Sequence, residues 1–215
     1  AGQNTTGGPN TFIGEKAGQT NTTGTQSVFI GNAAGNVNTT GGQNTIIGYN
    51  ADLSFNNWQN ATAIGFGAIV NNNNKIRLGN AAVSVIEGQV AFTAASDRRL
   101  KLNIKNIDHG LDFILKLRPV SYNMKNSSDG RSNWGFIAKE IEDIVGNENA
   151  VLTVGGDSDR TLGLRYTDFI APLVKAVQEQ QKEIEALQSK LSTKEKQIAE
   201  VEASLQEMKT MREEL

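Results

Sequence analysis

A serine and a lysine lie five positions apart in the stretch AASDRRLKLNI, which begins at Ala94. A serine hydroxyl is a weak nucleophile until a neighbouring base removes its proton, and a neutral lysine amine can be that base. Lysine is neutral near pH 7 only where burial or nearby positive charge lowers its pKa by several units. Ser96 and Lys101 are therefore candidates for a nucleophile and its general base. Arg98 and Arg99 could help to disfavour the ammonium form, although exposed arginines would do little.

Taken alone, this spacing favours a purely structural role. Serine and aspartate are common at the first positions of helices and turns, because their side chains accept hydrogen bonds from free backbone N–H groups. In that interpretation Ser96 and Asp97 begin a helix or turn, and the basic residues after them are solvated. The sequence on either side of Ser96 and Lys101 is needed to choose between the catalytic and the structural interpretation.

Upstream of the pair, the chain repeats itself every 17 residues, and an apolar-Ile-Gly core ends at Gly14, Gly31, Gly48 and Gly65. Each unit holds one short β-type run bounded by Gly and Asn, which tolerate positive φ in tight turns. A unit this short cannot bury its own apolar face, so the copies are expected to stack. The strict period disfavours the alternative, a disordered Gly/Asn/Thr linker. Because large apolar residues are few, we expect several chains to associate around an axis and complete the burial.

The period fails from Lys75, where apolar and polar residues alternate and predict two or three short strands around residues 76–78, 83–85 and 90–92. Residues 96–169 predict a small α+β unit. Its expected elements, in chain order, are a helix over 104–117 with a break at Gly110, a strand after Pro119, a helix over 138–145 and a hairpin around 155–157. Tyr166 and Phe169 are expected in its core.

From Ile170 onward, apolar residues follow two lines with a period of seven. The first line is Ile170, Val177, Ile184, Leu191, Ile198 and Leu205, and the second is Leu173, Leu187, Val201, Met208 and Leu215. Glu and Lys occupy the outer positions, so residues 170–215 predict a coiled coil. The mixture of Ile and Leu is compatible with a coiled coil of two, three or more helices. We expect three, because the 17-residue repeats upstream favour a trimer.

Composition narrows the function. A net charge of −2 argues against a nucleic-acid partner, and without cysteine there is no disulfide framework or thiolate metal site. No apolar run approaches the roughly 18 residues of a membrane span, so membrane insertion is not expected. His109 is expected in a turn, and Asp157 and Asp159 lack the spacing of a calcium loop. No cofactor or metal is predicted. Because the chain opens inside a repeat, we expect it to be part of a longer protein.

The repeat rhythm over residues 1 to about 80 resembles the head repeats of trimeric adhesins and of phage tail fibres. Those repeats form left-handed β-rolls or interwoven triple β-structures. The resemblance implies an elongated homotrimer displayed outward, with a host-surface glycan or receptor as a candidate partner.

We call residues 94–104 the seam, because they lie between the repeats and the rest of the chain. Four motifs, the first of them within this seam, resemble the intramolecular chaperone of endosialidases and tail spikes, a family classed as self-cleaving peptidases. They are Ser-Asp-x-Arg-Leu-Lys at residues 96–101, Leu-Arg-Pro-Val-x-Tyr at 117–122, Gly-Phe-Ile-Ala-Lys-Glu at 135–140 and Tyr-Thr-x-Phe-Ile-Ala-Pro-Leu at 166–173, and the resemblance extends to about residue 185. It implies that Ser96 is the nucleophile and Lys101 the base, attacking the Ala95–Ser96 bond of the same chain. The small Ala94 and Ala95 allow close approach to that bond.

The sequence therefore predicts a multi-part fibrous homotrimer with four segments: a β-repeat shaft at 1–74, a β neck at 75–95, an α+β chaperone and autoprotease at 96–169 and a coiled coil at 170–215. The predicted function is to trimerise and fold an upstream fibre or adhesin polypeptide, followed by single-turnover serine autoproteolysis. A tail fibre of a virion is the expected location, with a bacterial surface as the alternative. The alternative function is a trimerisation domain of a fibre tip or adhesin that is never cut.

Overall fold

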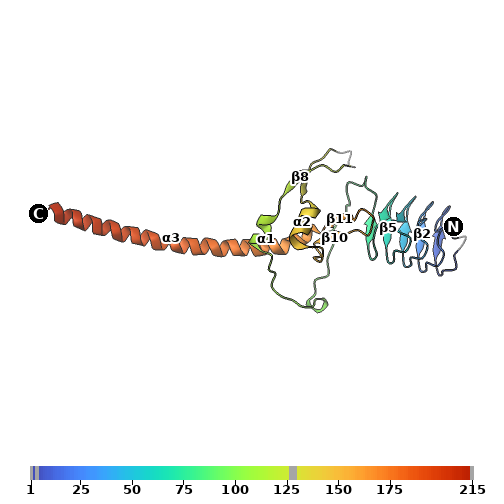
Figure 1. Ribbon diagram of the computed structural model, residues 1–215, viewed down its shortest axis with the longest axis horizontal. Helices are drawn as coiled ribbons and strands as arrows, with labels where there is room; N and C mark the ends of the chain where they lie inside the picture. Colours follow the sequence, from blue (N-terminus) through green and yellow to red (C-terminus); the bar gives the residue numbers. More distant parts are fainter. Residues whose placement is uncertain (1, 3–4, 126–129, 214–215) are drawn as a thin grey trace. The chain divides into compact units, whose positions relative to one another are not determined.

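The computed structural model (Figure 1) describes residues 2, 5–125 and 130–213. The chain divides into two compact units. The first unit combines residues 1–97 with 119–164, and the second combines 98–118 with 165–215. The chain therefore passes between the units at residues 97–98, 118–119 and 164–165. The first of these passages falls inside the stretch that contains Ser96 and Lys101.

The repeats form a β-solenoid, visible in Figure 1 as a stack of short strands. Five of them pair in parallel in the order β1 (Thr11–Ile13), β2 (Val28–Ile30), β3 (Thr45–Ile47), β5 (Thr62–Ile64) and β7 (Ile76–Leu78). A second small sheet pairs β4 (Asp52–Leu53) with β6 (Ile69–Val70). The register sets equivalent repeat positions side by side, as with Phe12 and Phe29. The predicted stacking is confirmed.

The core of this solenoid closes within one chain. Phe29 and Ile46 are fully buried, and the ring of Phe12 stacks on that of Phe29 with centroids 5.1 Å apart. Buried alanines fill most of the remaining interior. The expectation that several chains are needed to bury the repeats is therefore wrong for the interior. A coil this narrow is filled by small side chains, so few large ones are needed.

Asparagines take part in this interior as polar rungs. Asn44 Oδ1 accepts the Ala61 N–H at 2.9 Å, and its Nδ2 donates to the Trp58 carbonyl at 2.7 Å. Asn38 Nδ2 donates to Asn21 Oδ1 at 2.7 Å in the neighbouring coil. Buried amides cost little when they are hydrogen-bonded, so the Asn-rich repeat suits an inside position as well as turns.

The glycine that ends each strand is required by the backbone of the next coil. Gly31 has φ of +130°, and a Cβ placed on it would lie 2.5 Å from the Gly48 carbonyl oxygen. Gly48 stands in the same relation to Gly65. Stacked coils thus approach too closely at this point for any side chain, which explains why glycine recurs at the same position of each 17-residue repeat.

Only part of the predicted neck forms strands. Ile76–Leu78 is strand β7 and joins the solenoid sheet as its last member, beyond the shaft boundary expected at residue 74. The strands expected at 83–85 and 90–92 are not formed, and Val90 and Phe92 are 81% and 90% exposed. Alternation of apolar and polar residues needs a neighbouring sheet to become a strand, and the single chain supplies none here.

The remainder of the first unit agrees with the predicted α+β elements. Strand β8 (Val120–Tyr122) pairs antiparallel with β9 (Asn133–Gly135), and β10 (Leu152–Val154) pairs with β11 (Leu162–Leu164). Helix α2 (Ala138–Val145) lies between the two hairpins in the chain and buries Ile141. The strand after Pro119, the helix over 138–145 and the hairpin around Gly155 are therefore confirmed.

The second unit contains the two 3₁₀ turns η1 (Arg98–Leu100) and η2 (Tyr166–Phe169), helix α1 (Leu111–Lys116) and helix α3 (Ile170–Glu213). Of the helix expected over 104–117, only α1 after the predicted break at Gly110 is formed, and the Glu179 carboxylate of α3 accepts the Leu111 N–H at its start at 2.7 Å. Phe169 is buried as expected, but Tyr166 is 47% exposed, contrary to the prediction. The long helix expected from Ile170 onward is confirmed as α3. Its heptad residues, such as Leu187 at 63%, are exposed in the single chain.

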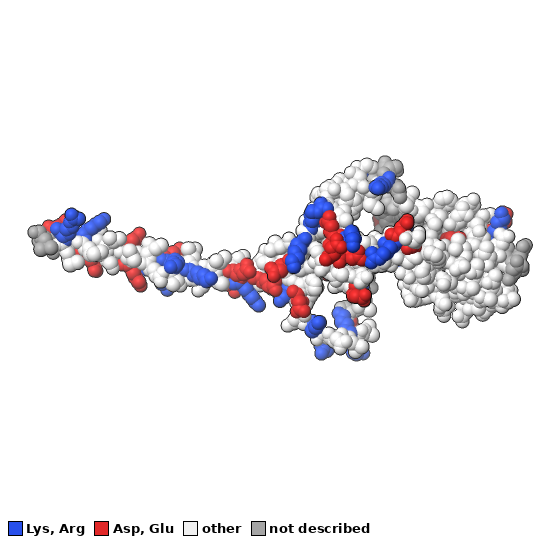
Figure 2. Space-filling model, in the orientation of Figure 1, with Lys and Arg blue, Asp and Glu red and all other residues white. Residues whose placement is uncertain are grey.

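Charged side chains are rare in the solenoid (Figure 2): residues 1–74 contain only Glu15, Lys16 and Asp52. Burial raises the pKa of Asp52 from 3.8 to about 6, although backbone N–H groups of Leu53 and Val37 stabilise its charge. The folded protein therefore takes up this proton before the unfolded chain does. The stability that this gives is fully present below pH 3.8 and is lost as the pH rises through about 6.

Asp52→Asn is expected to stabilise the solenoid at pH 7.5 by about 1–2 kcal/mol, because it removes a poorly solvated charge. The amide oxygen can still accept the N–H groups that Asp52 Oδ1 accepts, from Leu53 at 2.8 Å and Val37 at 3.1 Å. Thermal unfolding of both proteins between pH 7.5 and pH 4 is the measurement. The advantage of the variant should shrink as the pH falls, and a constant difference would contradict the assignment.

Candidate functional site

The seam that carries the candidate nucleophile and base is an exposed stretch of chain. Residues 91–97 have no regular secondary structure, and the turn η1 follows directly, closed by a hydrogen bond from the Lys101 N–H to the Arg98 carbonyl at 3.1 Å. Ser96 and Lys101 are both exposed. Ala95 is exposed as well, so the Ala95–Ser96 bond lies in an exposed part of the chain. A bond that is to be cut is accessible here.

The boundary between the two units runs between the predicted partners. Ser96 belongs to the first unit and Lys101 to the second, with the division after Asp97. The turn η1 also agrees with the structural interpretation, in which Ser96 and Asp97 precede a helical turn. The roles of Ser96 and Lys101 remain predictions.

The surroundings of Lys101 matter most for its chemistry, because a lysine acts as a base near pH 7 only where its charged form is disfavoured by burial or by other cations. In the single chain every residue from 91 to 108 is exposed. The apolar neighbours Leu100 and Leu102 are 71% and 89% exposed. Lys101 is therefore exposed in the single chain, between two exposed leucines in the sequence.

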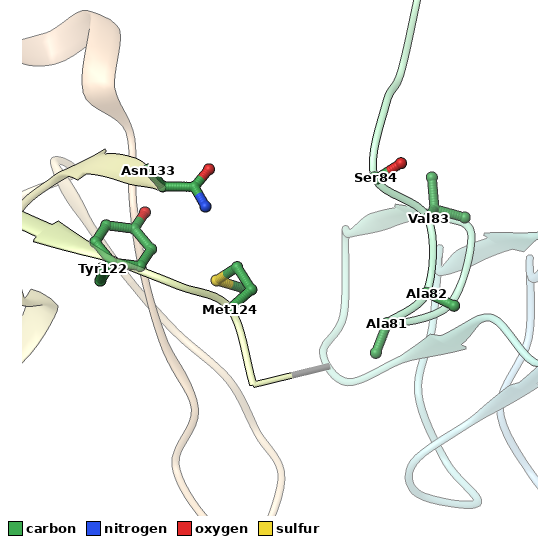
Figure 3. A pocket seen from close by; sticks show the side chains of 7 residues that line it. All are labelled: Ala81, Ala82, Val83, Ser84, Tyr122, Met124 and Asn133. Atoms are coloured by element: carbon green, nitrogen blue, oxygen red, sulfur yellow. The ribbon is translucent and has the colours of Figure 1, made fainter. Parts of the chain in front are cut away.

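A pocket of about 310 Å³ lies in the first unit between the end of the solenoid and the β8–β9 hairpin (Figure 3). Tyr122, Met124 and Asn133 face it from the hairpin, and residues 81–84 line the other side. Its described lining residues offer two hydroxyls and an amide, but no carboxylate, imidazole or amine.

The ion pairs of Glu142 connect helix α2 with the β10–β11 hairpin. Glu142 of α2 accepts hydrogen bonds from Arg160, in the β10–β11 connection, and from Lys139 at 2.9 Å. The guanidinium of Arg160, and next to it the Lys139 ammonium, lower the pKa of Glu142 to about 2. This pairing fixes α2 to the hairpin and leaves the carboxylate charged, so Glu142 is unsuited to donate or take protons near neutral pH.

In the second unit, contacts between α1 and α3 hold the segment that follows the seam. The Leu111 N–H donates to Glu179 Oε2, and this hydrogen bond, with Lys175, lowers the pKa of Glu179. His109 lies edge-on to the ring of Phe113, with centroids 4.9 Å apart. A Cβ on Gly110 would collide with the Glu179 carboxylate, so this side chain would have to move if residue 110 were larger. Sequence reasoning missed Glu179 because it reads as an outer position of the heptad.

No cluster of three or more His, Asp or Glu suited to a metal ion occurs within residues 2, 5–125 and 130–213. None of the helices in those ranges is long and apolar enough to cross a bilayer.

Residues 96–152 match the family described as the chaperone of endosialidase, peptidase S74. The match begins at Ser96 and includes the first three of the four predicted motifs, while the motif at 166–173 lies beyond it. A long tail fibre protein, Gp37 of Enterobacteria phage M1, is 34% identical over 104 residues, which cover 46% of this chain and 41% of that protein. The chain thus spans less than half the length of this relative. Both findings confirm the resemblance to a C-terminal chaperone of the tail-fibre type.

Proposed function

We propose that residues 96–215 act as an intramolecular chaperone, which trimerises a β-solenoid fibre and then cuts itself away between Ala95 and Ser96. The observation that carries this proposal is the start of the family match at Ser96, directly after the exposed stretch that follows the solenoid. Similarity to a long tail fibre protein favours a fibre of a phage tail over an adhesin of a bacterial surface. An upstream fibre polypeptide and a host-surface glycan or receptor are the expected partners.

The proposed cut has two steps. Ser96 Oγ attacks the carbonyl carbon of Ala95 while the Lys101 amine takes the hydroxyl proton, and the C–N bond breaks as the departing nitrogen is protonated. Ala95 is then joined to Ser96 Oγ as an ester. Water hydrolyses the ester, which leaves a carboxylate on Ala95 and a free amino group on Ser96. Since the nucleophile and the bond belong to one chain, effective molarities of about 10⁵–10⁸ M become available without a substrate pocket.

In the proposed mechanism, assembly of several chains buries Lys101, which is exposed in the single chain. The exposed Leu100 and Leu102 beside it suit burial against other copies of the chain. Such burial would desolvate the amine and favour its neutral, basic form. In this mechanism the chain is cut only after the C-terminal parts have assembled.

The outer face of the solenoid also favours association of several chains. Tyr49 and Phe66 stack with centroids 5.7 Å apart, and both rings remain more than half exposed. Ile13 and Ile76, in the first and last strands of the sheet, are 57% and 70% exposed. Side-by-side shafts need pairing in register, which is slow without a nucleus, and a preassembled C-terminal trimer would provide that nucleus. Removing the chaperone afterwards would trap the mature fibre kinetically.

Intact-mass measurement on freshly made protein, followed over time, tests this function. We expect the mass of the 215-residue chain to be replaced by the masses of residues 1–95 and 96–215, while native mass measurement reports a trimer. A trimer whose chains remain uncut would contradict the proteolytic step. Residues 96–215 would then act as a trimerisation domain that is never cut.

A further inference from the structure

The turn of the β10–β11 hairpin contacts the last coil of the solenoid within the first unit. The Gly156 N–H donates to the Asn71 carbonyl at 2.7 Å, and Asn72 Nδ2 donates to the Val154 carbonyl at 3.2 Å. Asn71 Nδ2 also donates to the carboxylate of Asp157. Three hydrogen bonds thus join residues 154–157 to two consecutive asparagines of the solenoid.

The fit is close enough to require glycine in the turn. A Cβ on Gly156 would lie 2.6 Å from Cη2 of Trp58 and 3.1 Å from the Asn71 carbonyl oxygen. A Cβ on Gly155 would lie 2.6 Å from Asn71 Nδ2. The indole is itself held, because its N–H donates to Ser54 Oγ at 3.1 Å and its ring meets that of Phe55 edge-on. The Gly-Gly pair therefore allows the hairpin backbone to lie against the Trp58 ring.

The turn residues are also held in shape on the hairpin side. Asp157 Oδ1 accepts the Thr161 N–H at 3.0 Å and its hydroxyl at 2.9 Å. Lys75 Nζ donates to Asn71 Oδ1 at 2.8 Å on the solenoid side. Both surfaces are thus ordered by their own neighbours before they meet, which lowers the entropic cost of docking.

These contacts join parts of the chain that lie on opposite sides of the Ala95–Ser96 bond. We infer that residues 154–157 are a latch on the last solenoid coil, which keeps the piece beginning at Ser96 bound to the shaft after the backbone has been cut. The inference rests on the proposed cleavage for its biological role, but the latch itself depends only on the contacts above. In this arrangement, cutting does not itself release the chaperone, and release requires the latch to open.

The test cuts the chain without using its own chemistry. The site of a sequence-specific protease is inserted after Gly88, in an exposed part of the neck, in a full chain that carries Ser96→Ala. After digestion we expect the two pieces to co-elute in native size-exclusion chromatography, and to separate when Gly156→Ala is added. Pieces that separate without this substitution, or that co-elute equally with it, would overturn the inference. Because the added protease makes the cut, failure of autoproteolysis would not affect the result.

Two further variants keep the result specific. Gly163→Ala is the matched control in the same hairpin, since its Cβ would meet only the Thr153 hydroxyl, and it should leave the pieces together. Asn72→Asp retains the side-chain oxygen that accepts the Asn73 N–H and loses the donor to Val154, so it should weaken co-elution without a steric clash. In the uncut chain, amide exchange at residues 154–157 should be about tenfold faster in Gly156→Ala than in the parent. Equal exchange rates would overturn the latch.

Discussion

Ser96→Ala is expected to leave the 215-residue chain intact under conditions in which the parent chain yields residues 1–95 and 96–215. The substitution removes the oxygen that attacks the Ala95 carbonyl, at a residue that is exposed and outside regular secondary structure. The variant should still assemble as the parent does. Intact mass under denaturing conditions, with native mass on the same sample, measures cleavage and assembly together.

Lys101→Arg tests the proposed base in the same assay. Arginine keeps the positive charge but does not deprotonate in proteins, so cleavage should slow by about 10²–10⁴-fold, the usual contribution of a general base. Ser84→Ala and Lys105→Ala alter an exposed serine and an exposed lysine close by and should cleave normally. If Ser96→Ala or Lys101→Arg is cut as fast as the parent, the assigned pair is wrong. If the two controls also fail, the effect comes from assembly and not from the chemistry.

The double substitution Ile184→Asp with Leu191→Asp is expected to abolish the proposed trimer and, with it, the proposed cut. Both side chains lie on one heptad line of α3 and are 48% and 59% exposed in the single chain, so the substitutions leave the contacts of one copy largely unchanged. Each Ile or Leu buried in a coiled coil contributes about 1.5–3 kcal/mol, and the loss recurs in every copy. Sedimentation velocity measures the assembly, and intact mass on the same fractions measures cleavage.

Ser189→Asp with Ala203→Asp is the matched control for this pair. It adds the same two charges to α3 but at positions off both apolar lines, so assembly and cleavage should persist. A trimer that survives Ile184→Asp with Leu191→Asp would show that the solenoid assembles without the helix. A monomer that is still cut would contradict the dependence of the Lys101 chemistry on assembly.

The sequence by itself determined those elements whose residue pattern matches their own geometry. The glycine spacing predicted the solenoid because stacked coils repeat the same close approach at Gly14, Gly31 and Gly48. The apolar pattern predicted α2 at 138–145 and a continuous helix from Ile170, and the Gly-Gly-Asp stretch predicted the β10–β11 turn. The four motifs between Ser96 and Leu173, taken together, predicted the match of residues 96–152 to the chaperone of endosialidase. In each case the signal lies within a short stretch of chain, so no distant contact was needed to recognise it.

Only the tertiary structure decided features that depend on what lies opposite. Val83, Val90 and Phe92 alternate like strand residues but find no sheet to join. The apolar residues of 104–109 are spaced like those of a helix but form none, whereas Glu179 accepts the Leu111 N–H where α1 begins. The closed interior of the solenoid depends on coil width, which composition does not reveal. The contacts of Gly156 with Asn71 and Trp58 join positions far apart in the chain, and no local sequence pattern predicts them. Burial and partners are properties of neighbours in space, which is why the fold had to supply them.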